Sequence, residues 1–297
     1  MAGAYNDAGE RYKDYADGSA KRLFAFDSLH SFSDQQTWAA IEERLHCLRL
    51  SGCRTLRVLD LGCGPGTWMR RVITRAHLMG FTEIISRGID LSDFQIQDAR
   101  KSCRTLAARG DIHLTFEVGD IRQAFPEEDK SIDLCLCLYG VLNHVRTVEL
   151  RPLLREIARV TSGWFVATAR AIGSTPTIYV ESVSEARNFR QDNQADCLEV
   201  EFRNGKSASF NSHLFNHIEM EGLVRSYLKL EQLRGLDIFH SRFAGDPRWN
   251  SGDCAAPAFI KELNSLEERY SRRPQFMDHA THLLIVATSL QPQCVSV

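Results

Sequence analysis

The chain has 297 residues, of which 43% are hydrophobic and 25% charged, and its formal net charge at pH 7 is −2. These values are ordinary for a globular protein, and the length is enough for one large α/β domain. The small net charge argues against an enzyme that holds nucleic acid on a broad basic face, so nucleic acid is an unlikely partner on this evidence. No apolar run approaches the ~20 residues of a membrane span, and the first residues lack the basic and apolar regions of a signal peptide. We therefore expect no membrane partner.

The nine cysteines follow no regular spacing. Cys63, Cys135 and Cys137 fall in apolar runs, where cysteine behaves as a small hydrophobic residue. This usage favours a reduced protein, and we predict a cytoplasmic location.

The N-terminal region is predicted to be irregular and then helical. Residues 1–32 are polar with several aromatic side chains and show no helical stripe, which is typical of a loosely packed arm. The alternative, implied only by the family resemblance given below, is a lid. Ser33 with Gln36 three residues later forms a capping box. We therefore predict that a helix begins there and continues to about Leu50.

A short apolar run followed by a glycine-rich turn dominates the sequence near residue 60. Residues 57–61 are typical of a buried parallel strand, because the run is too short to be a helix. Gly62, Gly64 and Gly66 follow at every second position, and a helix is predicted over residues 68–79. Glycine reaches positive φ without strain and lets a ligand approach the backbone. The turn and the N–H groups of the helix start therefore predict a ligand site.

The spacing of the glycines indicates which ligand. A dinucleotide turn needs G-x-G-x-x-G, but its third glycine would fall at 67 or 69, where threonine and methionine stand. Residues 60–66 instead resemble motif I of the class I S-adenosylmethionine (SAM) methyltransferases, an acid followed by G-x-G-x-G. A tight strand-to-helix turn without a ligand is the alternative interpretation.

Two more acids follow predicted strand ends. Asp90 ends the second strand, and Asp120 follows the third, residues 112–118. In doubly wound sheets, ligands bind outside the carboxyl ends of the strands, and a carboxylate there can accept from both ribose hydroxyls. The alternative is that Asp90 only caps the next helix. A capping box of Ser92 and Gln95 already serves that helix, which would leave Asp90 free for a ligand.

The resemblance also implies a role for the turn after the third strand. The family has an acid here that accepts from the adenine amino group, and the next backbone N–H meets a ring nitrogen. Asp120 and Ile121 match these two positions. The alternative is an ordinary Gly-Asp turn. Between the second and third strands we predict a helix over about residues 93–108.

A fourth predicted strand, residues 132–138, leads into Tyr139 and His144. This stretch resembles motif IV of small-molecule methyltransferases, which lies beside the reacting methyl group. It lacks the Asn-Pro-Pro-Tyr pattern of the branch that methylates base amino groups, which disfavours nucleic-acid acceptors. His144 is a candidate general base because histidine titrates near neutrality, and Tyr139 is the second candidate. A histidine that only caps or packs is the commoner alternative.

The pattern changes after the fifth predicted strand, residues 164–168. Residues 171–196 are polar and predict a loop over the site. Residues 198–202 and 207–210 alternate around an Asn-Gly turn, which predicts a β-hairpin. By resemblance this hairpin is a substrate cover. A second polar loop, residues 243–257, is an expected part of the cover or an ordinary surface loop.

Two histidines raise the question of a metal site. His213 and His217 lie near Glu219 and Glu221, but no third ligand is evident. A pair of histidines more often packs or caps, so we predict no metal.

The alternation of strands and helices predicts a parallel sheet with right-handed crossovers. With the resemblance, we expect a doubly wound α/β fold of seven strands in the order 3-2-1-4-5-7-6, mostly parallel with the last strand antiparallel, and an inserted β-hairpin cover. We predict one methyltransferase domain over 1–297, made of 1–50 (N-terminal lid and helix), 55–170 (SAM-binding core), 171–257 (cover with strand six) and 258–297 (last helix and strand).

The resemblance implies SAM as cofactor and a set of residues that contact it. These residues are Asp60, Gly62, Cys63, Gly64, Gly66, Trp68, Asp90, Leu91, Asp120, Ile121 and Leu138, with Tyr12 and Arg22 from the N-terminal segment. We expect methyl transfer to an oxygen or nitrogen of a small-molecule acceptor, with a homodimer as a possible assembly. The alternatives are an RNA or protein methyltransferase, or a non-catalytic SAM-binding subunit.

Overall fold

A computed structural model describes residues 23–26, 31–174, 186–240 and 257–290. The strands are β1 (Thr55–Leu61), β2 (Glu83–Asp90), β3 (Ile112–Val118), β4 (Ile132–Cys137), β5 (Thr161–Arg170), β6 (Ala186–Asp192), β7 (Cys197–Phe202), β8 (Ser207–Asn211), β9 (Lys229–Leu236) and β10 (His282–Thr288). The helices are α2 (Ser31–Leu50), α3 (Thr67–Leu78), α4 (Asp93–Ser102), α5 (Arg104–Ala107), the 3₁₀ helix η1 (Val141–His144), α6 (Thr147–Val160), α8 (His217–Arg225), α10 (Pro257–Tyr270) and α11 (Pro274–Met277).

Seven strands form one sheet in the order β3-β2-β1-β4-β5-β10-β9. The pairs from β3 to β5 are parallel, whereas β10 is antiparallel to both β5 and β9. This topology confirms the predicted fold class, with β9 and β10 as the sixth and seventh strands. Because β1 and β4 are neighbours although β2 and β3 intervene in the chain, the strand order reverses beside β1. Ligands of doubly wound folds bind at such a switch point.

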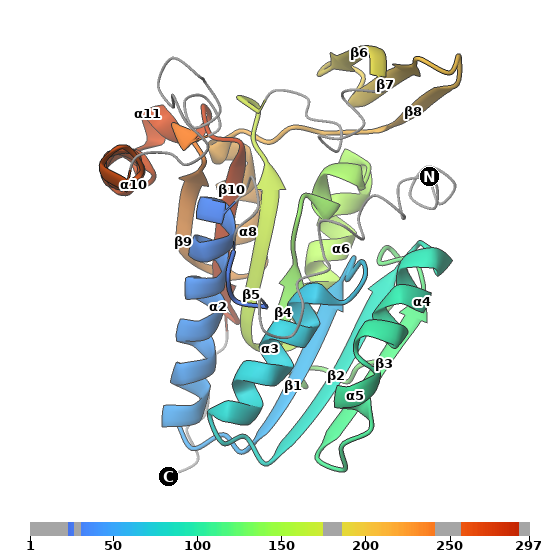
Figure 1. The fold of residues 1–297 in the computed structure, drawn as a ribbon, viewed down its shortest axis with the longest axis vertical. Helices are drawn as coiled ribbons and strands as arrows, with labels where there is room; N and C mark the ends of the chain where they lie inside the picture. The colour runs from blue at the N-terminus through green and yellow to red at the C-terminus, as the bar shows by residue number, and fades with distance from the viewer. Residues whose placement is uncertain (1–22, 27–30, 175–185, 241–256, 291–297) are drawn as a thin grey trace.

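Helices cover both faces of the sheet (Figure 1). On one face α2, α3 and α4 pack on the strands around a core that includes Ile41, Val72 and Ile96. On the other face α6 and α8 enclose a second core that includes Leu154 and Met220. With apolar side chains on both faces, the central strands are buried, which explains their continuous apolar runs.

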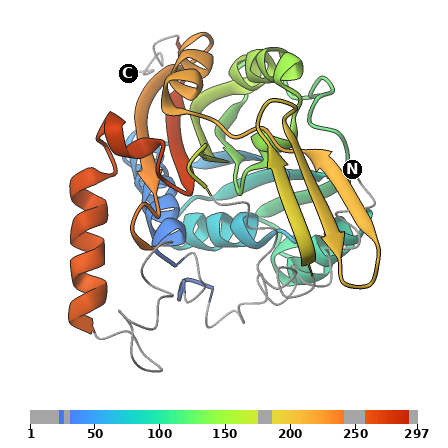
Figure 2. The same ribbon diagram turned by 90° about the horizontal axis from the view of Figure 1, so that it is seen from above.

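A second, three-stranded sheet in the order β6-β7-β8 lies beyond the carboxyl ends of the parallel strands (Figures 1 and 2). The predicted hairpin is present as β7 and β8, which are antiparallel. The prediction of an irregular loop over residues 171–196 was wrong for its last part, because β6 pairs with β7 along most of its length. The sequence of β6 is mostly polar and charged, and apolar periodicity identifies only strands that bury an apolar face, so this strand was not predicted.

Two local predictions were also wrong. The first helix begins at Ser31, before the predicted cap at Ser33. Ser33 is buried inside the helix, where its hydroxyl donates to the Asp237 carboxylate. The helix expected over residues 93–108 is interrupted at Cys103 and continues as α5. Burial of Ser33 against a residue more than 200 positions away is a tertiary event, which no local capping pattern reports.

Candidate functional site

A cavity opens at the carboxyl ends of β1, β2, β3 and β4, below the three-stranded sheet. Most of the predicted site residues line it: Asp60, Gly62, Cys63, Gly64, Trp68, Asp90, Leu91, Asp120, Ile121, Leu138, Tyr139 and His144. Gly66 does not line it. Tyr12 and Arg22 lie outside the described residues, so their predicted contacts stay predictions, as does the part of the 243–257 loop before α10. The fold therefore gathers residues from four strand ends that are up to 84 positions apart in the sequence.

The glycine turn has a left-handed backbone at all three glycines, with φ of 72° at Gly62, 52° at Gly64 and 76° at Gly66. A Cβ on Gly66 would lie 3.0 Å from the Phe116 ring, so this glycine permits close packing of the helix. A Cβ on Gly64 would meet no atom closer than 4.0 Å. The backbone at Gly64 is therefore open on its cavity side, as a ligand that approaches the main chain requires.

Asp60, at the end of β1, is a buried carboxylate on the cavity wall, with a residue exposure of 2%. Its Oδ2 atom has no hydrogen-bond partner among the described residues. Burial, and then the nearby Asp90 carboxylate, raise its pKa to about 7. A buried carboxylate without a partner is costly, so the atom is suited to a cationic or hydrogen-bond-donating ligand group.

The sequence predicted that Asp90, at the end of β2, would be free for a ligand, but the structure pairs its carboxylate with two backbone N–H groups. Its Oδ2 accepts from the backbone N–H of Gly64, and its Oδ1 accepts from the N–H of Ser92, both at 2.9 Å. The predicted capping contact of Ser92 with the Gln95 N–H is also present, at 3.3 Å. Asp90 thus fixes the glycine turn against the next turn. Each carboxylate oxygen has two lone pairs, so Asp90 retains acceptor capacity toward the cavity.

Asp120, after β3, is paired with Arg122, which sequence reasoning missed. The Arg122 guanidinium donates to both carboxylate oxygens at 2.5–3.0 Å and reaches Glu149 at 3.2 Å. The hydrogen bond from Arg122 holds the pKa of Asp120 below its usual value. Asp120 is therefore an ionised acceptor, and neighbouring Ile121 gives this end of the cavity an apolar side.

The segment after β4 carries the two predicted catalytic residues in an unusual backbone. Tyr139 and Gly140 both have positive φ, 57° and 73°. Thr168 of β5 holds them in place, because its hydroxyl accepts from the Tyr139 N–H at 2.7 Å and its carbonyl from the Gly140 N–H at 3.0 Å. The Tyr139 hydroxyl donates to Asp34 of α2, a second cavity residue that sequence reasoning missed.

His144 closes the 3₁₀ helix and lies on the cavity wall. Its Nδ1 is 2.9 Å from the carbonyl oxygen of Asn211, the last residue of β8. Burial lowers the pKa of His144 to about 4, so the ring is neutral at neutral pH. With a carbonyl beside Nδ1, the proton of the neutral ring resides on Nδ1.

The two histidines considered for a metal site contact carboxylates of this chain. His213 contacts Asp196 and Glu219 at 2.7 and 2.8 Å, and His217 contacts Asp278 at 2.9 Å. No set of three or more His, Cys, Asp or Glu residues in the described part of the chain is arranged to hold a metal ion. No helix within the described ranges is long and apolar enough to cross a membrane.

Comparison with known proteins shows which domain and fold this chain resembles. A family model described as a methyltransferase domain matches residues 58–163, which run from β1 to the start of β5. An uncharacterised 37.1 kDa protein of a Streptomyces fradiae transposon is 36% identical over 110 residues. That match covers 35% of this chain and 29% of the relative, so the chain matches less than a third of the relative's length.

Several solved structures share the whole fold. An SAM-dependent methyltransferase from Clostridium acetobutylicum has a TM-score of 0.54 and 12% identity, covering 96% of this chain and 99% of its own. Magnesium protoporphyrin IX methyltransferase from Synechocystis has a TM-score of 0.53 and 14% identity, and the match covers 97% of each chain. Geranyl diphosphate C-methyltransferase from Streptomyces coelicolor has a TM-score of 0.52 and 14% identity, and the match covers 96% of this chain and 98% of that structure. At these identities the likeness shows the fold. Residues 58–163 are therefore similar to a methyltransferase domain, and the seven-stranded sheet has the fold of these SAM-dependent methyltransferases.

Proposed function

We propose that the protein transfers the methyl group of SAM to an oxygen or nitrogen atom of a small-molecule acceptor. The observation that carries the proposal is the single cavity in which the glycine turn, Asp90 and the Asp120–Ile121 turn meet. These are the three parts that a zwitterionic amino acid, a ribose and an adenine need. Their order along the neighbouring ends of β1, β2 and β3 matches the order of those groups along SAM.

The residues present fit the donor. Asp120 is an ionised acceptor for the adenine amino group, with the apolar side chain of Ile121 beside it. Asp90 offers its remaining lone pairs to the ribose hydroxyls. At the glycine turn, the open backbone of Gly64 and the unpartnered Oδ2 of Asp60 suit the amino-acid end and its ammonium group. When bound, SAM supplies an electrophilic methyl group on a sulfonium.

The chain's own contribution to the reaction is alignment and proton removal. Methyl transfer is an in-line displacement, and holding two reactants in line can supply ~7–11 kcal/mol of barrier reduction. A base is required only when the acceptor atom carries a proton near neutral pH. We assign Tyr139 and His144 to the acceptor side, where both line the cavity. With a pKa of about 4, His144 is a weak proton acceptor, and we assign it mainly to hydrogen bonding of the acceptor.

Two features support a small acceptor. The three-stranded sheet lies beyond the carboxyl ends of the parallel strands, on the side where the cavity opens (Figure 2). Two structures with the same fold are named for small substrates, magnesium protoporphyrin IX and geranyl diphosphate. The second is named as a C-methyltransferase, and an oxygen or nitrogen acceptor remains our proposal for this chain.

The test begins with the donor. A thermal-shift titration with S-adenosylhomocysteine, with NAD as control, is made on the wild type and on Asp90→Ala. A ligand that binds only the folded state stabilises it by ~2.7 kcal/mol at a hundredfold excess over Kd. We expect stabilisation by S-adenosylhomocysteine, a smaller effect in Asp90→Ala and none from NAD.

The second step locates the acceptor. The protein is incubated with methyl-labelled SAM and a fractionated cell lysate, and label is measured in small metabolites, RNA and protein. We expect label in the small-metabolite fraction. Label only in RNA or protein would overturn the small-molecule acceptor, and absence of any response to S-adenosylhomocysteine would overturn the donor assignment.

A further inference from the structure

Asp34 and Tyr139 form a pair at the acceptor end of the cavity. Asp34 lies in the first turn of α2, and Tyr139 directly follows β4. Along the sheet, the proposed adenine, ribose and amino-acid contacts occupy the ends of β3, β2 and β1 in turn. The next strand end is that of β4. In SAM the sulfonium joins the ribose to the amino-acid part, so we place it near the ends of β2 and β1, in the same cavity as the pair.

The Tyr139 side chain is held in one position. Its φ of 57° is unfavourable for a residue with a Cβ, and such strain persists only where the surroundings impose it. Thr168 fixes the backbone on one side. On the other side the ring packs 6.0 Å from the Trp68 ring, and the hydroxyl contacts Asp34. A strained residue with a fixed hydroxyl in a cavity is a mark of a functional position.

Asp34 is a buried carboxylate with an exposure of 5%, and it is anchored from behind. Its neighbour Ser33 donates to Asp237, at the far end of β9, which fixes the start of α2 against the sheet. The hydroxyl of Tyr139 donates to Asp34, so the carboxylate is the proton-accepting member of the pair. Of the residues considered for proton removal, His144 is hydrogen-bonded through Nδ1 to Asn211, whereas the hydroxyl of Tyr139 is already joined to a carboxylate.

We propose that Asp34 takes up the acceptor's proton through the hydroxyl of Tyr139. The inference rests on the proposed function, because it requires SAM as the donor. As the acceptor atom forms its bond to the methyl carbon, the carbon–sulfur bond breaks and its electron pair stays on sulfur. The acceptor proton passes to the Tyr139 oxygen while the phenolic proton moves to an Asp34 oxygen. Asp34 later returns a proton to water, and S-adenosylhomocysteine leaves.

The test uses ligands whose charge differs at the reacting position. Sinefungin carries an ammonium group where the donor carries its methyl-bearing sulfonium, whereas S-adenosylhomocysteine is neutral there. Affinities for both are measured by calorimetry on the wild type, Asp34→Asn and Tyr139→Phe. Asp93→Asn is the control, because Asp93 also lies in the first turn of a helix but is exposed and does not line the cavity.

We expect the wild type and Asp93→Asn to bind sinefungin about tenfold to a hundredfold more tightly than S-adenosylhomocysteine, the range of charge-assisted hydrogen bonds. In Asp34→Asn and Tyr139→Phe this preference falls to near one, while affinity for S-adenosylhomocysteine changes less than threefold. A structural role alone would weaken both ligands together and leave their ratio unchanged, which would overturn the inference. Tyr139→Phe keeps the ring against Trp68 and so remains informative if Asp34→Asn folds poorly.

The same variants decide the proton step once an acceptor is labelled in the lysate. We expect Asp34→Asn to lower kcat at least tenfold with little change in the KM for SAM, and to remove the acid limb of the pH–rate profile. An unchanged profile would overturn proton uptake by Asp34. If the wild type binds neither ligand, the proposed donor fails as well. If both bind with a preference that Asp34→Asn leaves intact, only this inference fails.

Discussion

At Gly62 the backbone has a φ of 72°, and a Cβ built there would lie 2.3 Å from Cγ2 of Val141. The glycine therefore satisfies two demands at once, a left-handed turn and close contact between the β1 and β4 ends. Val141 begins the 3₁₀ helix beside Tyr139, so this contact joins the glycine turn to the segment that carries Tyr139 and His144.

Gly62→Ala is expected to destabilise the protein by about 2–4 kcal/mol, from the left-handed conformation and the overlap with Val141. The same substitution at Gly110, where a Cβ meets no atom within 4 Å, serves as control. Urea unfolding of both variants gives the two free energies. Equal, small changes would show that the turn adapts and that the contact is not needed.

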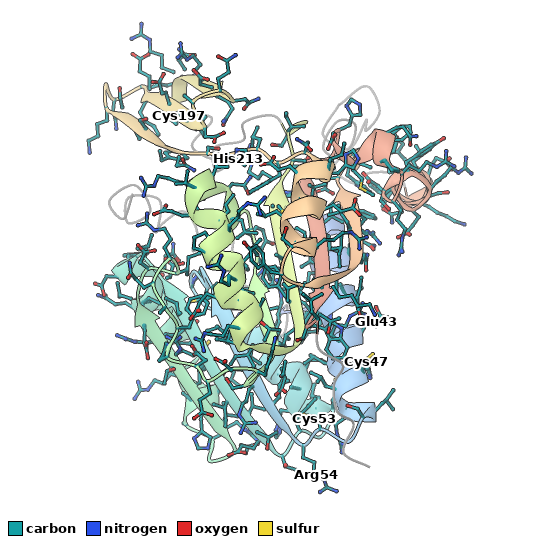
Figure 3. All side chains as sticks on the ribbon, turned by 180° about the vertical axis from the view of Figure 1, so that it is seen from behind. Glu43, Cys47, Cys53, Arg54, Cys197 and His213 are labelled. Carbon is teal, nitrogen blue, oxygen red and sulfur yellow. The ribbon has the colours of Figure 1, made fainter. Side chains whose placement is uncertain are left out.

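At the scale of elements, the three-stranded sheet is fastened to the segment after β4. The side-chain amide of Asn211 donates to the carbonyls of Asn143 and Val145, at 3.1 and 3.3 Å. The His213 N–H donates to the same Asn143 carbonyl, at 2.8 Å. The cover and the acceptor-side residues are thus one connected unit, and Figure 3 shows His213 just below the sheet that carries Cys197.

His213 makes this connection sensitive to pH. Burial lowers its pKa, but the hydrogen bonds to Glu219 and Asp196 outweigh burial and raise the pKa to about 8. Because this pKa exceeds the unfolded value of about 6.5, the stabilisation is complete below pH 6.5 and is lost as pH rises through 8. His213→Gln is expected to cost about 2 kcal/mol more at pH 6 than at pH 9.5, measured by urea unfolding. His113→Gln, at an exposed histidine of β3, is the control. A cost that does not depend on pH would contradict this account.

For the whole molecule, the cavity carries an electrostatic cost. Asp60 lies between the two cores, with Asp90 as a neighbouring carboxylate and no hydrogen-bond partner for Oδ2 among the described residues. Its raised pKa means that, between about pH 4 and 7, the folded state holds a proton that the unfolded state has lost. Stability therefore falls as pH rises through this range.

Asp60→Asn removes that titration. We expect the stability of Asp60→Asn relative to wild type to increase by about 2–3 kcal/mol between pH 5 and pH 8, because only the wild type loses stability as the Asp60 pKa of about 7, raised from 3.8, is passed. The measurement is urea unfolding without ligand at both pH values, with exposed Asp93→Asn as control. A difference that stays constant with pH would show that Asp60 is ionised throughout.

Much of this protein follows from local pattern in the sequence. Apolar runs predicted the central strands of the main sheet, because strands covered by helices on both sides are apolar on both faces, and alternating apolar residues predicted the edge strand β3. The alternating glycines predicted a turn that is left-handed at each of them, because glycine adopts positive φ at the least steric cost. Acids placed at successive strand ends predicted that Asp60, Asp90 and Asp120 would lie together, and they line one cavity, because parallel strands bring their carboxyl ends to one edge.

Only the tertiary structure decided which side chains contact Tyr139 and His144 and which groups have raised or lowered pKa values. The Tyr139 hydroxyl donates to Asp34, which lies 105 positions earlier in the sequence, and the capping pattern around Ser33 did not predict this contact. The Arg122 guanidinium donates to the Asp120 carboxylate. The carbonyl oxygen of Asn211, at the end of the mostly polar strand β8, contacts Nδ1 of His144. Whether a carboxylate or an imidazole is charged depends on burial and on partners brought from distant elements. Those are properties of packing in space, and periodicity along the chain does not record them.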